Sequence, residues 1–324
     1  MKIGKNIRVS AVTATLVVSA MALTACGGSD GGATTGSAGS LASTVDLSGV
    51  TMSVGSKEYP EQKILGEILV QTLEAAGAKV TDKTGLAGTN VARAALESGE
   101  INAYYEYTGT AWLTIFKKTN PITDPNALFD AVRADDATND ISWFAPAPFN
   151  NTYGLGASPD AAKGTGVKTL SDYAELARTN PKEATLCASA EFATRDDGLP
   201  GLEKAYDFKQ PEGTVYPVEV TVIYQAIQQK KCNFMYLVST DSRLAKEHIT
   251  VLDDDKTFFP IYNPAVNMTG NIYDANKAKY DKLFDAVAKL LTQDTILELN
   301  GQVELDGLPA DLVVQKFLQK HKII

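Results

Sequence analysis

The sequence predicts an α/β fold with two open sheets, one in each of two lobes. Two patterns point to it. From Val45 onward, short β-rich runs alternate with stretches whose apolar residues recur at helical spacing, which is typical of open, mostly parallel α/β sheets. A proline-containing break at residues 144–149 then interrupts the alternation, and a second run of the same kind follows. A chain of 324 residues, 44% of them hydrophobic, is also long enough for about two domains.

The first run shows its elements through apolar spacing and through residues that start or stop helices. In order, we expect a strand at 50–54, a helix at 64–73, a strand at 79–81, a helix at 89–98 and a strand at 101–105. Gly77 can end the first helix, Thr89 can cap the second, and a further helix begins near Gly109.

The second run repeats the alternation. We expect a helix at 170–179, a strand at 185–188, a helix at 222–230 and a strand at 234–238. A helical segment at 274–292 follows and closes the chain. Two crossings between lobes are the simplest arrangement, which assigns residues 45–147 and 257–324 to lobe 1 and residues 148–256 to lobe 2.

The N-terminus has the features of a secretion signal. Residues 1–25 contain a basic start and an apolar stretch, 11–23, that is too short to span a bilayer comfortably. The sequence Leu23-Thr-Ala-Cys26 resembles a bacterial lipobox, in which the cysteine becomes the lipidated first residue of the mature protein. An ordinary signal peptide with an incidental cysteine is the alternative.

Residues 26–44 consist mainly of Gly, Ser, Ala and Thr, so we expect a flexible tether. The prediction is an extracytoplasmic protein that is anchored to the bacterial cell membrane by lipid on Cys26. The two remaining cysteines, Cys187 and Cys232, form an even pair in an oxidising compartment and are a candidate disulfide. Two buried free cysteines remain the alternative.

Composition and missing motifs exclude several classes of protein. The formal charge of −9 argues against nucleic-acid binding. The two histidines, His248 and His321, together with three cysteines are too few for a His-rich or Cys-based metal site. No phosphate-binding Gly-x-x-x-x-Gly-Lys-Ser/Thr motif occurs, and a serine nucleophile would lack a suitable base. We therefore expect no enzyme, no cofactor and no metal.

Tyrosine is the more informative residue type. Several of the 13 tyrosines lie where a strand passes into a loop or helix, among them Tyr107, Tyr153 and Tyr262. In open α/β sheets, ligands bind outside the carboxyl ends of the strands. Aromatic faces that converge there can surround a quaternary ammonium ion, which cannot donate hydrogen bonds. Any one of these tyrosines, taken alone, is better explained as an ordinary strand or interface residue.

Lys57, Arg195 and Thr110 occupy comparable positions after strands or at a helix start. A lysine charge, an arginine fork and a hydroxyl at a helix N-terminus together suit a carboxylate. Surface charge is the alternative explanation for Lys57 and Arg195 individually. We call the tyrosines the aromatic cage and call Lys57, Thr110 and Arg195 the carboxylate clamp. A ligand that fits both is a zwitterion with a methylated nitrogen.

A set of motifs carries a resemblance to a known family. They are Val54-Gly-Ser-Lys57-Glu-Tyr-Pro, Glu106-Tyr-Thr-Gly-Thr110, Asn150-Asn-Thr-Tyr153, Thr194-Arg-Asp-Asp-Gly198 and Thr240-Asp241. Together they resemble the substrate-binding lipoproteins of glycine betaine/choline/osmoprotectant ABC importers, over about Val45 to Phe317. The resemblance implies a two-lobed periplasmic-binding-protein fold of type II with a two-crossing hinge. It also implies a monomer without catalytic activity that delivers its ligand to an ABC permease and the associated ATPase.

The resemblance also implies roles for individual residues. Tyr107, Tyr153 and Tyr262 would hold the trimethylammonium group, and Lys57, Thr110 and Arg195 would hold the carboxylate. One position departs from the family, which often has a tyrosine where this chain has Val238. Tyr236 lies two residues earlier, on the same face of the strand, and is a candidate substitute.

The retained carboxylate residues favour glycine betaine or a related betaine as ligand. A choline-selective receptor of the same family is the main alternative, because choline has no carboxylate. The alternatives from other classes are an enzyme on the same two-lobed scaffold and an adhesive surface lipoprotein. The shortage of nucleophiles and bases argues against the enzyme, and the strand-end loops rich in Tyr, Lys and Arg argue against the adhesin.

Overall fold

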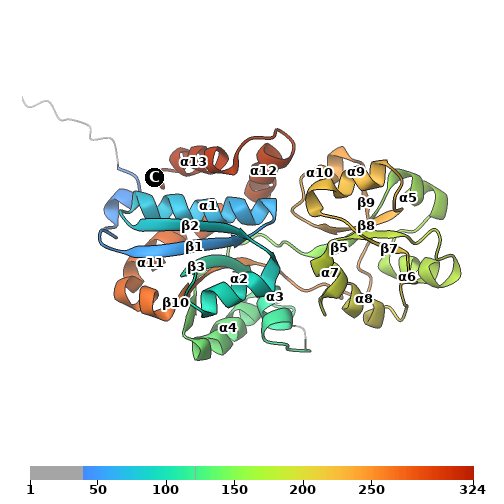
Figure 1. The fold of residues 1–324 in the computed structure, drawn as a ribbon, viewed down its shortest axis with the longest axis horizontal. Helices are drawn as coiled ribbons and strands as arrows, with labels where there is room; N and C mark the ends of the chain where they lie inside the picture. Colours follow the sequence, from blue (N-terminus) through green and yellow to red (C-terminus); the bar gives the residue numbers. More distant parts are fainter. Residues whose placement is uncertain (1–38, 121) are drawn as a thin grey trace, which may run out of the picture. The chain divides into compact units, whose positions relative to one another are not determined.

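The computed structural model describes residues 39–120 and 122–324, which form two five-stranded sheets with flanking helices (Figure 1). The predicted signal peptide, the lipidation site Cys26 and most of the tether lie outside the described residues. The compact unit begins at Gly39. The predicted α/β class with two open sheets is therefore confirmed.

The first sheet has the strand order β2-β1-β3-β10-β4. Its strands are β1 (Thr51–Lys57), β2 (Lys79–Leu86), β3 (Ala103–Tyr107), β4 (Ile141–Trp143) and β10 (Pro264–Thr269). Strand β1 pairs in parallel with β2 and β3, whereas β10 is antiparallel to both β3 and β4.

Helices cover both faces of this sheet (Figure 1). They are α1 (Pro60–Ala75), α2 (Gly88–Glu97), α3 (Thr108–Thr110), the π-helical turn η2 (Ala111–Ile115), α4 (Pro125–Asp136), the 3₁₀ turn η3 (Ala137–Asn139), α11 (Gly270–Leu290), α12 (Gln293–Glu304) and α13 (Ala310–Lys320). Strand β3 shows how the faces separate: Ala103, Tyr105 and Tyr107 pack with α1 and α11–α13, whereas Tyr104 packs with α2 and α4. This period of two is what a strand buried on both faces requires.

The second sheet has the order β7-β6-β8-β5-β9. Its strands are β5 (Tyr153–Ala157), β6 (Leu186–Ala188), β7 (Val215–Pro217), β8 (Phe234–Val238) and β9 (Thr250–Val251). The accompanying helices are α5 (Pro159–Thr165), α6 (Leu170–Thr179), α7 (Ala190–Thr194), α8 (Leu199–Ala205), the 3₁₀ turn η4 (Val220–Val222), α9 (Ile223–Gln228) and α10 (Arg243–Lys246). Strand β6 is parallel to β7 and β8, and β5 is antiparallel to β8 and β9.

Three expectations about the elements are wrong. The sheets are mixed rather than mostly parallel, because β5 and β10 each run against both of their neighbours. Thr89 lies inside α2, whose N-cap is Ala87, so it does not cap that helix. The helix expected to close the chain is followed by α12 and α13.

The tether is shorter than predicted. Residues Ala42–Thr44 form the 3₁₀ turn η1, and Ala42 is fully buried. The N–H groups of Leu41 and Ala42 donate to the carbonyl oxygens of Lys322 and Ile323 at 2.8 and 2.9 Å. These bonds and the apolar contacts of η1 fix residues 41–44 to the C-terminal end of the chain.

The chain passes from the first sheet to the second between β4 and β5 and returns between β9 and β10. The two crossing segments bond to each other. The Asn151 N–H donates to the Tyr262 carbonyl oxygen at 3.0 Å, and the Thr152 hydroxyl donates to the Pro260 carbonyl oxygen at 3.0 Å. We retain residues 148–256 as the proposed bounds of lobe 2, since both crossings lie at its ends.

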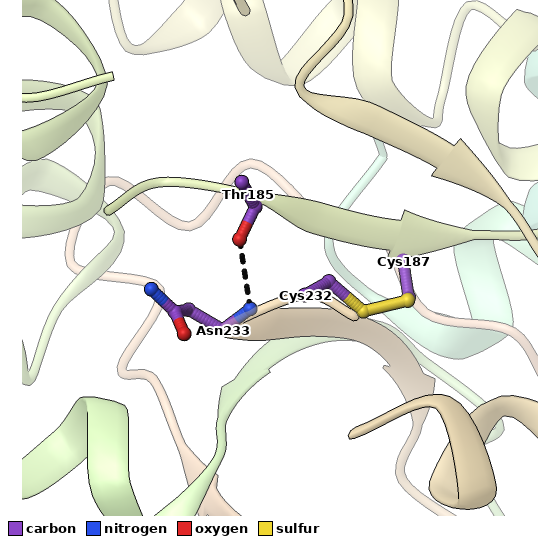
Figure 2. The surroundings of a disulfide bond; sticks show 4 residues. All are labelled: Thr185, Cys187, Cys232 and Asn233. Carbon is purple, nitrogen blue, oxygen red and sulfur yellow. Dashed lines mark hydrogen bonds between the residues drawn. A yellow bond between two sulfur atoms is a disulfide. The ribbon is translucent and has the colours of Figure 1, made fainter. Parts of the chain in front are cut away.

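A disulfide joins Cys187 in β6 to Cys232, just before β8, with the two Cα atoms 5.7 Å apart (Figure 2). The parallel pairing of β6 with β8 brings the two residues together. Beside it, the Asn233 N–H donates to the Thr185 hydroxyl at 2.9 Å, which continues the contact between the two chain segments.

Candidate ligand-binding site

One pocket is lined by residues of both sheets and has an empty volume of about 680 Å³, counting its open mouth. All seven predicted ligand residues line it: Lys57, Tyr107, Thr110, Tyr153, Arg195, Tyr236 and Tyr262. Sequence reasoning missed further lining residues, among them Tyr59, Glu61, Asn151, Glu191, Arg243, Asn300 and Glu304. A polar network therefore surrounds the predicted residues.

The strands explain why these side chains meet. Lys57 ends β1 and Tyr107 ends β3, and the carboxyl ends of two parallel strands lie at one edge of a sheet. Tyr153 instead begins β5. Because β5 is antiparallel to β8, Tyr153 pairs with Val238 at the carboxyl end of β8 and reaches the same edge of its sheet.

Aromatic rings are close together in the pocket. The Tyr153 ring centroid lies 5.4 Å from that of Tyr262 and 6.3 Å from that of Tyr236. Phe192 supports the group from behind, at 5.4 Å from Tyr153 and stacked at 5.0 Å on Tyr236. Tyr107 and Tyr59 line the same pocket. Rings at these separations are in edge-to-face, tilted or stacked contact, so they form one aromatic cluster at the pocket.

The departure from the family motif at Val238 falls within the pocket lining. Tyr236 also lines the pocket, although it is only 6% exposed and lies opposite Leu155 in the strand pairing. The structure thus brings both positions to the pocket. Which of them contributes to ligand binding is part of the proposal below.

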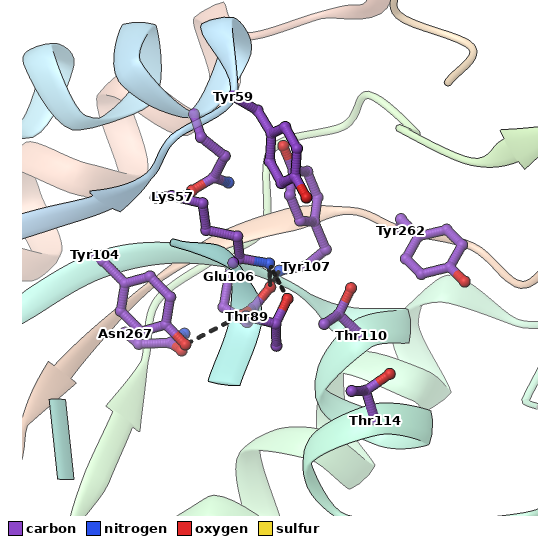
Figure 3. Close-up of polar contacts among 12 residues, drawn as sticks. Lys57, Tyr59, Thr89, Tyr104, Glu106, Tyr107, Thr110, Thr114, Tyr262 and Asn267 are labelled. Carbon is purple, nitrogen blue, oxygen red and sulfur yellow. Dashed lines mark hydrogen bonds and ion pairs between the residues drawn. The ribbon is translucent and has the colours of Figure 1, made fainter. Parts of the chain in front are cut away.

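Lys57 is buried and already has protein partners. Its Nζ lies 2.7 Å from Glu106 Oε1 and 2.9 Å from Thr89 Oγ1 (Figure 3). Glu106 in turn accepts hydrogen bonds from the Tyr104 hydroxyl at 3.1 Å and from the Tyr107 N–H at 2.8 Å. The lysine charge is therefore balanced by a buried carboxylate with three donors, the arrangement that a buried ion pair needs.

Arg195 is paired in the same way. Its Nε donates to Asp197 Oδ1 at 2.7 Å, and its Nη2 also bonds to that carboxylate and to Thr110 Oγ1, the latter at 3.2 Å. The Tyr262 hydroxyl donates to Asp197 Oδ2 at 2.7 Å. The remaining nitrogen, Nη1, lies 3.2 Å from Glu191 Oε1. Two carboxylates thus share one guanidinium.

Glu191 links the two lobes at the pocket. It lies at the start of α7, yet its Oε1 accepts a hydrogen bond from the Thr89 N–H of α2 at 3.2 Å, and its Oε2 accepts one from the Tyr59 hydroxyl. Burial alone would raise the pKa of Glu191, but Lys57, Arg195 and these donors outweigh it and lower the pKa to about 2. Glu191 is therefore a carboxylate at neutral pH.

A second acidic network centres on Glu61 at the start of α1. Its carboxylate accepts hydrogen bonds from the Tyr107 hydroxyl at 2.6 Å, from Asn151 Nδ2 at 3.0 Å and from Asn300 Nδ2 at 2.9 Å. Asn300 Nδ2 also donates to the Thr240 carbonyl oxygen at 2.9 Å. Burial raises the pKa of Glu61 above its ordinary value. The network ties α1, α12 and the loop after β8 together.

Burial also governs the phenols. It raises the pKa values of Tyr107, Tyr153 and Tyr262 well above the ordinary value of 10. The hydroxyls therefore stay protonated at neutral pH, and the rings are neutral donors beside the carboxylates of Glu61 and Asp197.

Within the described residues, His, Cys, Asp and Glu form no group that could hold a metal ion. His248 and His321 are both exposed. No helix in the described part of the chain is long and apolar enough to cross a membrane. The pocket lining includes aromatic rings, paired charges, hydroxyls and side-chain amides.

Two sheets joined by two crossings, with an aromatic and charged pocket lined from both, define a two-lobed solute-binding protein. The chain belongs to the family described as the substrate binding domain of ABC-type glycine betaine transport systems, which matches residues 50–320. It is thus the substrate-binding component of a glycine betaine/carnitine-type ABC transporter, and the predicted family is confirmed.

Two relatives and one solved structure show how far the similarity extends. The chain is 31% identical over 279 residues to a glycine-betaine-binding protein of Pseudomonas aeruginosa, covering 85% of this chain and 89% of the relative. It is 32% identical over 279 residues to the glycine betaine-binding protein YehZ of Escherichia coli, covering 83% and 90%. A crystal structure titled glycine betaine/carnitine/choline ABC transporter has a TM-score of 0.64 and 25% identity, covering 85% of this chain and 99% of that one.

Proposed function

We propose that this protein captures a small quaternary-ammonium osmolyte in the pocket and delivers it to an ABC permease. The observation that carries the proposal is that all seven residues predicted from the sequence, spread from Lys57 to Tyr262, line one pocket. Family membership supports the delivery step. The first candidate ligand is glycine betaine or a related betaine.

In this proposal, Tyr107, Tyr153, Tyr236 and Tyr262 surround the methylated nitrogen. Such a nitrogen is apolar on its outside and permanently charged, so it gains from aromatic faces what it cannot gain from hydrogen bonds. Each contact contributes about 0.5–2 kcal/mol, and several together give a useful affinity. The ring separations of 5.4 and 6.3 Å around Tyr153 support this role.

The carboxylate of a betaine is assigned to Lys57, Thr110 and Arg195. A charged donor, a hydroxyl and a guanidinium are the groups that bind carboxylates most strongly. The bond from Arg195 Nη2 to Thr110 Oγ1, at 3.2 Å, supports their acting at one place.

Choline is a second candidate, and one observation favours it. Lys57 and Arg195 already face Glu106 and Asp197, so their charges are balanced without a ligand carboxylate. A cation without a carboxylate would leave both of these charge pairs undisturbed.

Isothermal titration with glycine betaine, proline betaine, carnitine and choline tests the proposal. We expect saturable binding of at least one of them, and weaker binding of 3,3-dimethylbutan-1-ol, a neutral analogue of choline. The recovered ligand should be chemically unchanged, as expected of a receptor without catalytic activity. No heat and no thermal shift with any of the four would contradict the proposal.

We also propose that the protein is a monomer outside the cytoplasm and that lipid on Cys26 anchors it to the bacterial cell membrane. The lipobox resemblance and the polar segment after it support this. Metabolic labelling with a fatty acid should mark the wild type and leave Cys26→Ser unlabelled. Labelling of both would contradict the anchor while leaving the ligand proposal intact.

A further inference from the structure

We propose that Glu191 supplies the chain's own carboxylate where a ligand carboxylate would bind, and that it thereby sets the discrimination between zwitterionic betaines and carboxylate-free cations such as choline. The inference rests on the proposed function, since it concerns the ligand class of the same pocket. Glu191 lies in none of the residue sets that the sequence predicts.

The geometry is that of a carboxylate bound by several donors. Glu191 Oε1 accepts from the Thr89 N–H at 3.2 Å and lies 3.2 Å from Arg195 Nη1, while Oε2 accepts from the Tyr59 hydroxyl. The Thr89 N–H belongs to the first turn of α2, where the helix dipole favours an anion. Thr89 Oγ1 is in turn bonded to Lys57 Nζ at 2.9 Å, so Glu191 lies near both cations of the proposed clamp, Lys57 and Arg195.

Most of the charged donors of the clamp already have carboxylate acceptors in the protein. Lys57 Nζ contacts Glu106, and two nitrogens of Arg195 contact Asp197. Arg195 Nη1 is the nitrogen not bonded to Asp197, and Glu191 accepts from it. A betaine carboxylate that uses Nη1 must displace Glu191 or lie next to its negative charge.

The electrostatics lead to the same conclusion. The lowered pKa of Glu191, about 2, means that the side chain keeps its charge throughout the neutral range. Its side chain is only 15% exposed, so water screens the charge weakly. This charge repels the carboxylate of a betaine. It attracts the cationic nitrogen of choline and that of a betaine equally, so only the carboxylate separates the two ligands.

Glu191 also has a mechanical connection to the cage. Tyr59 bonds to it and lines the pocket, and Phe192, the next residue, stacks on Tyr236 at 5.0 Å. A ligand that displaces the Glu191 carboxylate also releases the Tyr59 hydroxyl. Zwitterions therefore disturb one wall of the cage, and carboxylate-free cations leave it in place.

The test compares dissociation constants for choline and glycine betaine in the full mature chain. Glu191→Gln keeps the shape and removes the charge, so we expect the ratio of choline to betaine affinity to fall about tenfold, the usual difference between a charged and a neutral hydrogen-bonding partner. Using the ratio removes any effect of the variant on lobe closure that both ligands share. Glu191→Asp, which retains the charge, should stay closer to wild type than Gln.

Glu58→Gln is the matched control. The Glu58 carboxylate accepts from the Gly88 N–H at 2.6 Å, at the same end of α2, but Glu58 does not line the pocket. We expect its ratio to stay within about twofold of wild type, because this charge is not among the groups that meet the ligand. If Glu58→Gln changed this ratio as much as Glu191→Gln does, the effect would come from the overall negative charge near α2, and the specific role of Glu191 would be refuted.

The other outcomes are also decisive. If Glu191→Gln weakens or strengthens both ligands by one factor, the inference is wrong, although the proposed function stands. If neither ligand binds the wild type, the proposed function fails first. Should Glu191→Gln not fold, Glu191→Ala carries the test: it also removes the negative charge, and the ratio of choline to betaine affinity must fall for the inference to hold.

Discussion

Tyr153 gives the sharpest test of the aromatic cage. Its ring lies 5.4 Å from the Tyr262 ring and 6.3 Å from the Tyr236 ring, and the guanidinium carbon of Arg195 lies 5.4 Å from its centroid. Tyr153→Leu removes the π face and keeps an apolar side chain. We expect the dissociation constant for the bound quaternary ammonium ligand to rise about 2- to 30-fold, which corresponds to one lost cation–π contact of about 0.5–2 kcal/mol.

Two further variants separate the face of the ring from other effects. Tyr153→Phe retains the face, so its affinity should stay close to wild type. Tyr216→Leu is the matched control, because Tyr216 in β7 also carries a protein cation, Lys231 Nζ at 5.9 Å, but does not line the pocket. Its affinity should be unchanged.

The assay is isothermal titration at fixed pH and salt, with thermal melts to show that each variant is folded. A folded Tyr153→Leu protein with wild-type affinity would refute the cage. Equal losses in the Phe and Leu variants would assign the effect to the hydroxyl group and would refute the cation–π explanation.

Three predictions concern stability. Lys57→Met leaves Glu106 buried without its cation, so the free energy of unfolding measured in urea melts should fall by about 3–5 kcal/mol. The double variant Lys57→Met/Glu106→Gln should recover most of this loss. A double variant as unstable as Lys57→Met would contradict the importance of the ion pair. Replacing Cys187 and Cys232 by serine removes a cross-link between residues 45 positions apart, so the free energy of unfolding should fall by about 4 kcal/mol. A reductant should lower the melting temperature of the wild type and leave that of the variant unchanged. Burial and the Asp241 carboxylate raise the pKa of Glu304 from its ordinary 4.5 to about 7. The folded protein therefore binds this proton more tightly than the unfolded chain, so the free energy of unfolding falls as the pH rises from about 4.5 to about 7. Glu304→Gln should flatten that decline in urea melts at several pH values, and an unchanged slope would show that another group causes it.

Local signals explain which elements were predictable from the sequence. The helix at Leu170–Thr179 and the strand at Phe234–Val238 match their predicted bounds. The helix carries its own capping box, in which Thr169 and Asp172 satisfy each other's backbone, and the strand is a continuous apolar run. Such elements are specified by neighbouring residues alone.

Strand β10 was missed for the opposite reason. It begins with Pro264 and contains Asn267, which are poor strand residues by local preference. It becomes a strand because it pairs with β3 on one side and β4 on the other, more than 100 residues earlier in the chain. The mixed direction of the first sheet follows from this one strand.

The site also has a part that is recognisable from the local sequence and a part that depends on distant contacts. Five of the seven predicted residues stand in the family motifs, Tyr262 was named from its place after a strand, and Tyr236 was named from its place on the same strand face as Val238. Glu191 lies only four residues before Arg195, but its contacts are with Thr89 and Tyr59, which are 102 and 132 positions away in the sequence. Tyr59 could have been predicted from the sequence, because it follows β1 in the same strand-to-helix turn as Lys57.

The replacement of the family's tyrosine by Val238 need not leave the cage incomplete. Tyr59 and Tyr236 both line the pocket beside Val238, and each is held by a partner: Tyr59 by the Glu191 carboxylate and Tyr236 by the stacked ring of Phe192. Those two partners are consecutive residues on α7. The same short helix would therefore supply the internal carboxylate and support two walls of the cage. If the cage and Glu191 act as proposed, any change in the position of α7 alters both, so the strength of the cage and the choice between cation and zwitterion are coupled.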